Sequence, residues 1–169
     1  MKPDELNHFE KFNFEPSFQI DEIELEARYL ELQQQFHPDV VDDKIEAEIN
    51  SILINQAYKI LKNPLKRAIY LLQLQGINID DEFNVEKPSQ DILLLIMKLR
   101  EDILENKNDL EKIKELKQKI ANLLGDEMEL ISNLLAKKQH KLATQNLIKA
   151  KYLDKILQDL KWDLALKPV

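Results

Sequence analysis

The sequence predicts an all-α protein, and three observations support this fold class. Leu, Ile, Glu, Lys and Gln dominate the composition, only two glycines occur in 169 residues, and most of these residue types favour helix. Apolar residues recur at helical spacing over long segments, whereas no segment alternates with the period of two that marks a strand. Hydrophobic residues make up 44% of the chain, which is enough for a packed core in one domain or two small ones.

Two helices are predicted near the N-terminus. An aromatic cluster over residues 9–14 indicates a first helix of barely two turns. Asp21 has the character of an N-cap, and Glu24 stands where the reciprocal partner of a capping box belongs. The second helix is therefore expected over residues 22–36. Its apolar stripe has members at i, i+4, i+7 and i+11: Leu25, Tyr29, Leu32 and Phe36.

Two prolines are expected to delimit a loop and the next two helices. Pro38 lacks an N–H and disfavours helix in the preceding residue, so a loop is predicted over 37–43. The third helix should span 44–62 and pack through one stripe: Ile49, Leu53, Ala57, Ile60 and Leu61. Pro64 then begins a fourth helix that runs to about Gln75, with Gly76 as its C-terminal glycine.

The C-terminal half is predicted to form a three-helix bundle. Residues 77–90 show no helical stripe and indicate a linker. Three long helical segments follow with short connections, which favour antiparallel packing; they are expected at 89–106, 109–136 and 138–166. Gly125 should kink the middle helix or split it. The predicted domains are residues 1–76, a linker at 77–88 and a bundle over 89–169.

Composition excludes several classes of function. The chain has no cysteine, which rules out disulfides, thiolate catalysis and cysteine-ligated metal. Its net charge is −7, and residues 1–76 hold 14 of the 31 acidic side chains but only 8 of the 24 basic ones. Nucleic acid and anionic membranes are therefore not expected partners. No apolar segment is long enough to cross a membrane.

No catalytic or cofactor site can be recognised. The three histidines lack metal-ligand spacing, the carboxylates are spread at surface spacing, and the near absence of glycine excludes a phosphate-binding loop. We expect no enzyme, no metal and no cofactor. The N-terminus has neither a secretory signal nor a transit peptide, and the bacterial cytoplasm is the expected location.

Three motifs in the first 75 residues resemble those of the J-domain, the activator module of DnaK-type ATPase chaperones. His37-Pro38-Asp39 lies between two amphipathic helices, Ile54–Leu61 is similar to the family's pattern on the third helix, and Lys66–Tyr70 is similar to its lysine-arginine-alanine-x-tyrosine run. The resemblance implies that the second helix and the loop dock on the ATP-bound chaperone. It implies chaperone contacts for Arg28, His37, Pro38 and Asp39.

The first bundle helix has more apolar residues than one packing face needs. One set points toward the bundle: Ile92, Leu95, Ile96, Leu99 and Ile103. Leu93, Met97 and Leu104 lie a quarter to a third of a turn away, and Leu94 and Glu101 lie on the far side. This second set is either an exposed binding patch or a surface that the J-domain or a wider core covers.

A J-domain followed by such a bundle resembles HscB, the co-chaperone family of iron–sulfur cluster biogenesis. The resemblance implies an HscA-like chaperone and an IscU-like scaffold protein as partners. The implied scaffold contacts are Leu93, Leu94, Met97, Glu101 and Tyr152. Tyr152 lies beside a stripe that would make it partly core: Leu142, Leu153, Ile156 and Leu160.

One departure from the J-domain pattern leaves other interpretations open. J-domains carry basic residues on the second helix, whereas Arg28 is the single basic residue here, so weak and salt-insensitive docking is expected. Two alternatives remain: a J-domain co-chaperone for a different client, and a helical adaptor whose J-like domain activates nothing.

Overall fold

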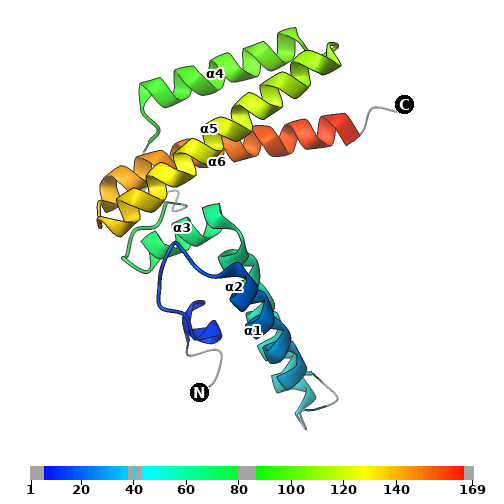
Figure 1. The fold of residues 1–169 in the computed structure, drawn as a ribbon, viewed down its shortest axis with the longest axis vertical. Coiled ribbons are helices and arrows are strands. Elements are labelled where there is room, and N and C mark those ends of the chain that lie inside the picture. The colour runs from blue at the N-terminus through cyan, green and yellow to red at the C-terminus, as the bar shows by residue number, and fades with distance from the viewer. Residues whose placement is uncertain (1–5, 38–39, 41–42, 80–86, 166–169) are drawn as a thin grey trace. The chain divides into compact units, whose positions relative to one another are not determined.

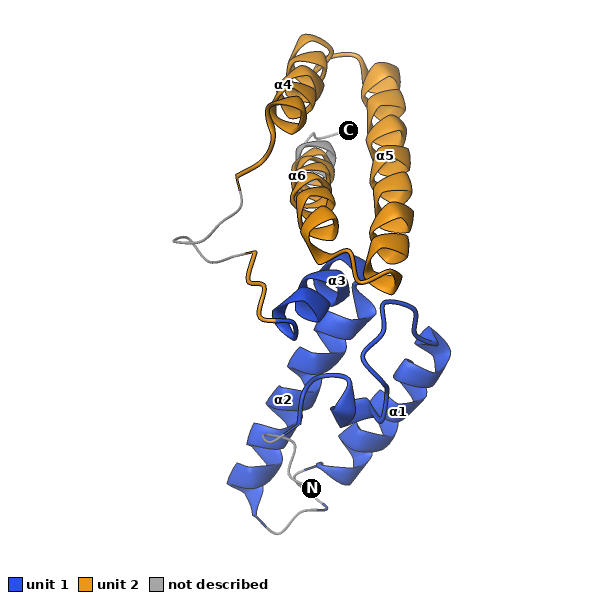
Figure 2. Ribbon diagram, turned by 90° about the vertical axis from the view of Figure 1, so that its left-hand side faces the viewer, with its two compact units in different colours: residues 1–75 blue, residues 76–169 orange. Residues whose placement is uncertain are grey.

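The computed structural model describes residues 6–37, 40, 43–79 and 87–165, and the elements in these ranges are all helical (Figure 1). They are a 3₁₀ turn, η1 (Glu10–Phe12), and the helices α1 (Glu22–Gln35), α2 (Lys44–Lys62), α3 (Pro64–Gln73), α4 (Gln90–Glu105), α5 (Leu110–Ala136) and α6 (His140–Ala165). The expected all-α fold class is confirmed. Contacts divide the chain into two compact units, Met1–Gln75 and Gly76–Val169 (Figure 2).

Side-chain caps fix where most of the helices begin. Five helices start after a residue whose side chain accepts hydrogen bonds from first-turn N–H groups: Asp21, Asp43, Asn63, Ser89 and Asp109. Such residues are readable in sequence, and the N-cap predicted at Asp21 is observed. The expected helix starts lie within two residues of the observed ones. The carboxylate expected to complete a capping box, that of Glu24, accepts a hydrogen bond from Arg28.

The hairpin of α1 and α2 forms the core of the first unit. Leu25 of α1 is buried in one cluster with Ile54, Ala57 and Leu61 of α2, and Phe9 and Phe12 close this cluster from the N-terminal segment. The rings of Tyr29 and Tyr58 stack with centroids 4.0 Å apart, and the Tyr29 hydroxyl donates to Asn55 Oδ1 at 2.7 Å. The hairpin is therefore held by both apolar packing and polar contacts.

Two expectations for this unit were wrong in detail. The first helix is a single 3₁₀ turn of three residues and not two turns. The buried stripe of α2 follows a strict spacing of three and four: Ala47, Asn50, Ile54, Ala57 and Leu61. Ile49 lies outside this stripe and is exposed. The error arose because the true stripe contains an alanine and an asparagine at its start, and so looks less apolar than its neighbour.

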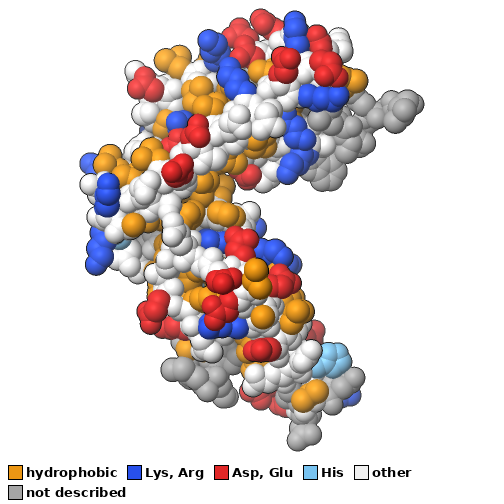
Figure 3. Space-filling model, in the orientation of Figure 1, with side chains coloured by type: hydrophobic (Ala, Val, Ile, Leu, Met, Phe, Trp, Pro, Cys, Tyr) orange, Lys and Arg blue, Asp and Glu red, His pale blue; other side chains and the backbone are white. Residues whose placement is uncertain are grey.

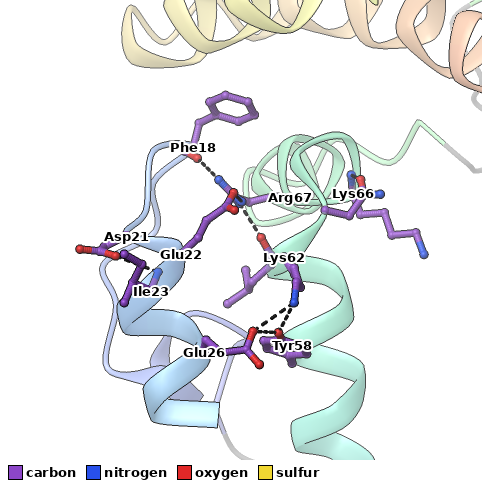
Figure 4. A network of polar contacts seen from close by, with 11 residues as sticks. Phe18, Asp21, Glu22, Ile23, Glu26, Tyr58, Lys62, Lys66 and Arg67 are labelled. Atoms are coloured by element: carbon purple, nitrogen blue, oxygen red, sulfur yellow. Dashed lines mark hydrogen bonds and ion pairs between the residues drawn. The ribbon is translucent and has the colours of Figure 1, made fainter. Parts of the chain in front are cut away.

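Helix α3 secures the hairpin through two residues of its motif. The Arg67 side chain is buried and donates to the carbonyl oxygens of Leu61 at 2.6 Å and Phe18 at 2.7 Å, and it pairs with Glu22 at 3.2 Å (Figure 4). The hydroxyl of Tyr70 accepts a hydrogen bond from the backbone N–H of His8 at 3.0 Å. The lysine-arginine-alanine-x-tyrosine run therefore acts inside the first unit.

The second unit is a three-helix bundle whose first helix is the shortest. Helix α4 has 16 residues, against 27 in α5 and 26 in α6. All five expected core residues of α4 belong to the bundle's apolar cluster, with Ile92, Ile96 and Leu99 buried and Leu95 and Ile103 packed against them. At 1.5 Å per residue, α4 covers little more than half the length of its neighbours.

Two further expectations, for α6 and α5, were wrong. Leu142 was assigned to the buried stripe of α6, but it is exposed, whereas Leu153, Ile156 and Leu160 are buried. Leu142 lies in the first turn of α6, whereas Leu153, Ile156 and Leu160 belong to the apolar cluster that also contains Ile92, Ile96 and Leu99 of α4. Gly125, expected to kink or split α5, lies inside an unbroken helix.

Candidate functional site

The expected chaperone site lies at the tip of the α1–α2 hairpin. Phe36 ends α1 and packs against the apolar cluster of the first unit, and Asp43 caps α2 through the N–H groups of Ile45 and Glu46. His37 lies exposed between these two anchors. Pro38 and Asp39 fall outside the described residues. Both ends of the loop are thus fixed by packing and by capping.

Arg28, the fourth residue expected at this site, points into its own unit. Its guanidinium donates to the carbonyl oxygen of Phe12 and to the carboxylate of Glu24, and it lies 4.5 Å from the ring centroid of Phe14. These contacts satisfy the charge within the domain. The single basic side chain of α1 is therefore committed to holding the N-terminal segment against the helix.

The expected scaffold site lies on the side of α4 that faces away from the bundle. Leu93 is 42% exposed, Leu94 64% and Met97 67%, and Glu101 is exposed one turn further on. Hydrophobic side chains are visible on the surface where α4 runs in the upper part of Figure 3. No other described residue of the second unit covers these four side chains. The alternative in which a wider core buries them therefore does not hold within this unit.

Tyr152 occupies an intermediate position. It is half-buried on α6 and packs against the apolar cluster that holds Leu153 and Ile156. The expected partly core character is therefore observed. The four α4 residues share one helix face, and Tyr152 comes from another element.

Sequence reasoning missed two outward apolar stripes on the first unit. Ile23 and Leu30 are exposed on α1, and Ile45, Ile49 and Ile52 are exposed on α2. Each set repeats at three-, four- or seven-residue intervals on the side opposite its helix's buried stripe, so a check of both faces of each helix would have found them. The described residues contain no cluster of three or more His, Cys, Asp or Glu that could hold a metal ion.

Comparison with known proteins defines the class first. A DnaJ domain model matches residues 7–70, and a model of the HSCB C-terminal oligomerisation domain matches residues 88–161. The class is that of a J-domain co-chaperone with a dedicated C-terminal helical domain.

Relatives with known names define the family. A co-chaperone protein HscB homolog from Neisseria meningitidis is 34% identical over 165 residues, which cover 90% of this chain and 96% of the relative, and one from Aeromonas salmonicida is 33% identical over 92% of this chain and 94% of its own. The chain therefore belongs to the HscB family of co-chaperones.

Solved structures agree with this assignment. Chaperone HscB from Vibrio cholerae superposes with a TM-score of 0.81 at 27% identity and covers 93% of this chain and 96% of its own. Human co-chaperone protein HscB superposes with a TM-score of 0.85 at 28% identity, over 94% of this chain and 82% of its own. The J-domain and the helical C-terminal domain thus occur together in both structures.

Proposed function

We propose that this protein stimulates the ATPase of a DnaK-type, HscA-like chaperone and delivers an IscU-like scaffold protein to it during iron–sulfur cluster assembly or transfer. The observation that carries the proposal is the exposed apolar face of α4, made of Leu93, Leu94 and Met97, in a chain of the HscB family. The protein carries out no reaction of its own, because hydrolysis takes place on the chaperone. It acts in the cytoplasm of a bacterium, as the bacterial origin of the relatives above suggests.

The first unit acts on the chaperone through the tip of its hairpin. His37, Pro38 and Asp39 contact the ATP-bound chaperone and favour its hydrolysing conformation. This works only if the J-domain binds that conformation more tightly than the others, because a ligand shifts an equilibrium by its differential affinity alone. Arg28 contributes from inside the J-domain by fixing the helix that leads to the tripeptide.

The second unit holds the scaffold. Leu93, Leu94 and Met97 supply the apolar contact, and Glu101 supplies a charge at its edge that fixes orientation. Tyr152 adds an aromatic ring at the boundary of the bundle core. Because one chain holds both partners, each raises the effective concentration of the other, and hydrolysis then closes the chaperone on the delivered scaffold.

ATPase stimulation of the cognate chaperone, measured with and without scaffold, tests this proposal. His37→Gln should abolish stimulation and leave scaffold affinity unchanged. The triple change of Leu93, Leu94 and Met97 to Ala should lower scaffold affinity by about 100-fold, since exposed apolar anchors contribute roughly 1 kcal/mol each, and should leave basal stimulation intact.

The same measurements separate the alternatives. Normal stimulation by His37→Gln would contradict the proposal and favour an adaptor with an inactive J-like domain. If the triple variant binds the scaffold as tightly as the wild type, the scaffold does not bind through the α4 face, and the assignment of this face to the scaffold fails. Leu110→Ala serves as the control, because Leu110 is an exposed leucine on a different helix of the same bundle.

A further inference from the structure

The outward face of α1 is apolar. Ile23 is 84% exposed and Leu30 is 52% exposed, and Ala27 lies exposed between them. The three residues follow at i, i+4 and i+7 on the side of the helix opposite the buried Leu25. Figure 4 shows Ile23 on the side of α1 that faces away from α2.

This face offers no positive charge to an acidic partner. Arg28, the one basic residue of α1, is bound to the Phe12 carbonyl and to Glu24. Lys62 of α2 reaches α1, but its ammonium binds Glu26 at 3.0 Å and the Tyr58 hydroxyl at 2.6 Å (Figure 4). The charges on the visible surface of the hairpin, in the lower part of Figure 3, are largely acidic.

The apolar face runs along α1 toward its C-terminal end, next to His37. Ile23 and Leu30 are seven residues apart, and seven residues advance a helix by about 10 Å with a rotation of only about 20° from two full turns. His37 comes two residues after the end of α1. Leu30 is therefore nearer to His37 along α1 than Ile23 is, and a single globular partner that engages His37 and extends along this face would meet Leu30 first.

We propose that the α1 face of Ile23, Ala27 and Leu30 docks by apolar contact on a hydrophobic surface of the DnaK-type chaperone, in place of an electrostatic contact. This inference rests on the proposed function. Its occupant is the chaperone because the face continues the contact made by His37. An acidic chaperone surface is disfavoured because it would meet the exposed carboxylates of α1 without an available cation.

The expected signature is a docking that responds to apolar contact and not to salt. The double variant Ile23→Gln/Leu30→Gln should raise the concentration of full-length protein needed for half-maximal ATPase stimulation by at least about tenfold. Stimulation at saturation should stay near that of the wild type, because the tripeptide is intact. Raising NaCl from 50 to 300 mM should change the half-maximal concentration of the wild type by less than about twofold.

Three further variants make the test specific. Leu110→Gln alters a leucine with the same 52% exposure on another unit and should change nothing. Leu30→Lys should weaken docking on an apolar surface, whereas an acidic surface would bind it more tightly. Ile45→Gln/Ile49→Gln changes the outward stripe of α2 and should have less effect than the α1 pair.

The apolar docking face and the proposed function are refuted by different results. An unchanged half-maximal concentration for the α1 pair, tighter docking by Leu30→Lys, a steep loss of stimulation with salt, or an effect confined to the α2 pair would each refute the apolar docking face. None of these results would touch the proposed function as long as His37→Gln still abolishes stimulation. If His37→Gln stimulates normally, the proposed function itself fails.

Discussion

Arg67 shows most clearly how one residue of a recognisable motif can hold the fold of its own domain together. Its buried guanidinium joins three separate segments: the end of α2 at Leu61, the connector at Phe18 and the first turn of α1 at Glu22. Burial lowers the pKa of Arg67, and the hydrogen bond with Glu22 opposes that shift. The charged form is held by its acceptors, so the motif connects the first turn of α1 to the end of α2.

Arg67→Met should therefore destabilise the J-domain strongly. The change leaves two carbonyl oxygens without their donor, which costs on the order of 2–4 kcal/mol. Glu22→Gln is the matched control and should cost less than about 1 kcal/mol, because Glu22 is largely exposed. Hydrogen exchange of the α1 and α2 amides measures both effects. Equal protection in Arg67→Met and the wild type would show that the guanidinium contacts contribute little.

His8 gives the J-domain a dependence on pH. Its ring stacks on Tyr70 with centroids 4.2 Å apart, and burial, aided by the nearby charge of Lys11, lowers its pKa from 6.5 to about 4. The unfolded chain therefore binds a proton between these pH values that the folded chain does not. Stability must fall as pH decreases from 6.5 toward 4, and the loss is complete below pH 4.

His8→Gln should remove this contribution. Between pH 7 and 5.5 the wild type is expected to lose on the order of 1 kcal/mol more stability than the variant. Urea unfolding at the two pH values, followed by far-ultraviolet circular dichroism, gives the loss of unfolding free energy for each protein. The contributions of the acidic residues are the same in both proteins and cancel in the comparison. Parallel pH profiles would mean that the folded protein protonates His8 as readily as the unfolded chain does.

At the scale of single elements, the two glycines provide a matched pair. A Cβ atom at either glycine would meet no atom within 4 Å, but Gly76 has a φ of +76° whereas Gly125 lies within the helix α5. The two sites therefore differ in backbone conformation and not in available space.

Replacement by alanine should have opposite effects at the two sites. Gly125→Ala should stabilise the bundle by about 0.5–1 kcal/mol, because alanine favours helix and restricts the unfolded chain. Gly76→Ala should be destabilising by about 1 kcal/mol, since an L side chain is strained at positive φ. Thermal unfolding of the full chain compares them. A loss of stability in Gly125→Ala would indicate that α5 needs a flexible point there.

The elements also show what the sequence could and could not predict. The N-cap at Asp21 placed the start of α1, because the cap is a local interaction. The phase of the α2 stripe was misjudged at Ile49, since a small or polar residue can occupy a core position that only the partner helix defines. The burial of Leu142 could not be predicted, because periodicity shows which residues of α6 share a face but not how far along the helix that face is covered.

The candidate site could likewise be predicted only where its features are local in the sequence. The surplus face of α4 could be predicted from periodicity, because the count of apolar residues exceeded one packing face. The inward orientation of Arg28 could not, since it depends on the Phe12 carbonyl and the Phe14 ring, which tertiary folding brings to α1. The sequence of α1 alone does not show in which direction the Arg28 side chain points.

At the scale of the whole molecule, the proposed function requires two separate binding surfaces in one chain. The hairpin tip belongs to the unit Met1–Gln75, and the α4 face belongs to the unit Gly76–Val169. Coupling between the partners then comes from the covalent connection, because it makes the second binding event intramolecular. Two chains that each carry one intact surface should not replace one chain that carries both.

A mixing experiment tests whether both binding surfaces must lie on the same chain. The His37→Gln variant and the Leu93/Leu94/Met97→Ala variant are combined in equal amounts with chaperone and scaffold, and scaffold-dependent ATPase stimulation is compared with that of the wild type. We predict that the mixture stays at the level of the triple variant alone, because no single chain can hold both partners. Restoration of wild-type stimulation by the mixture would contradict the account.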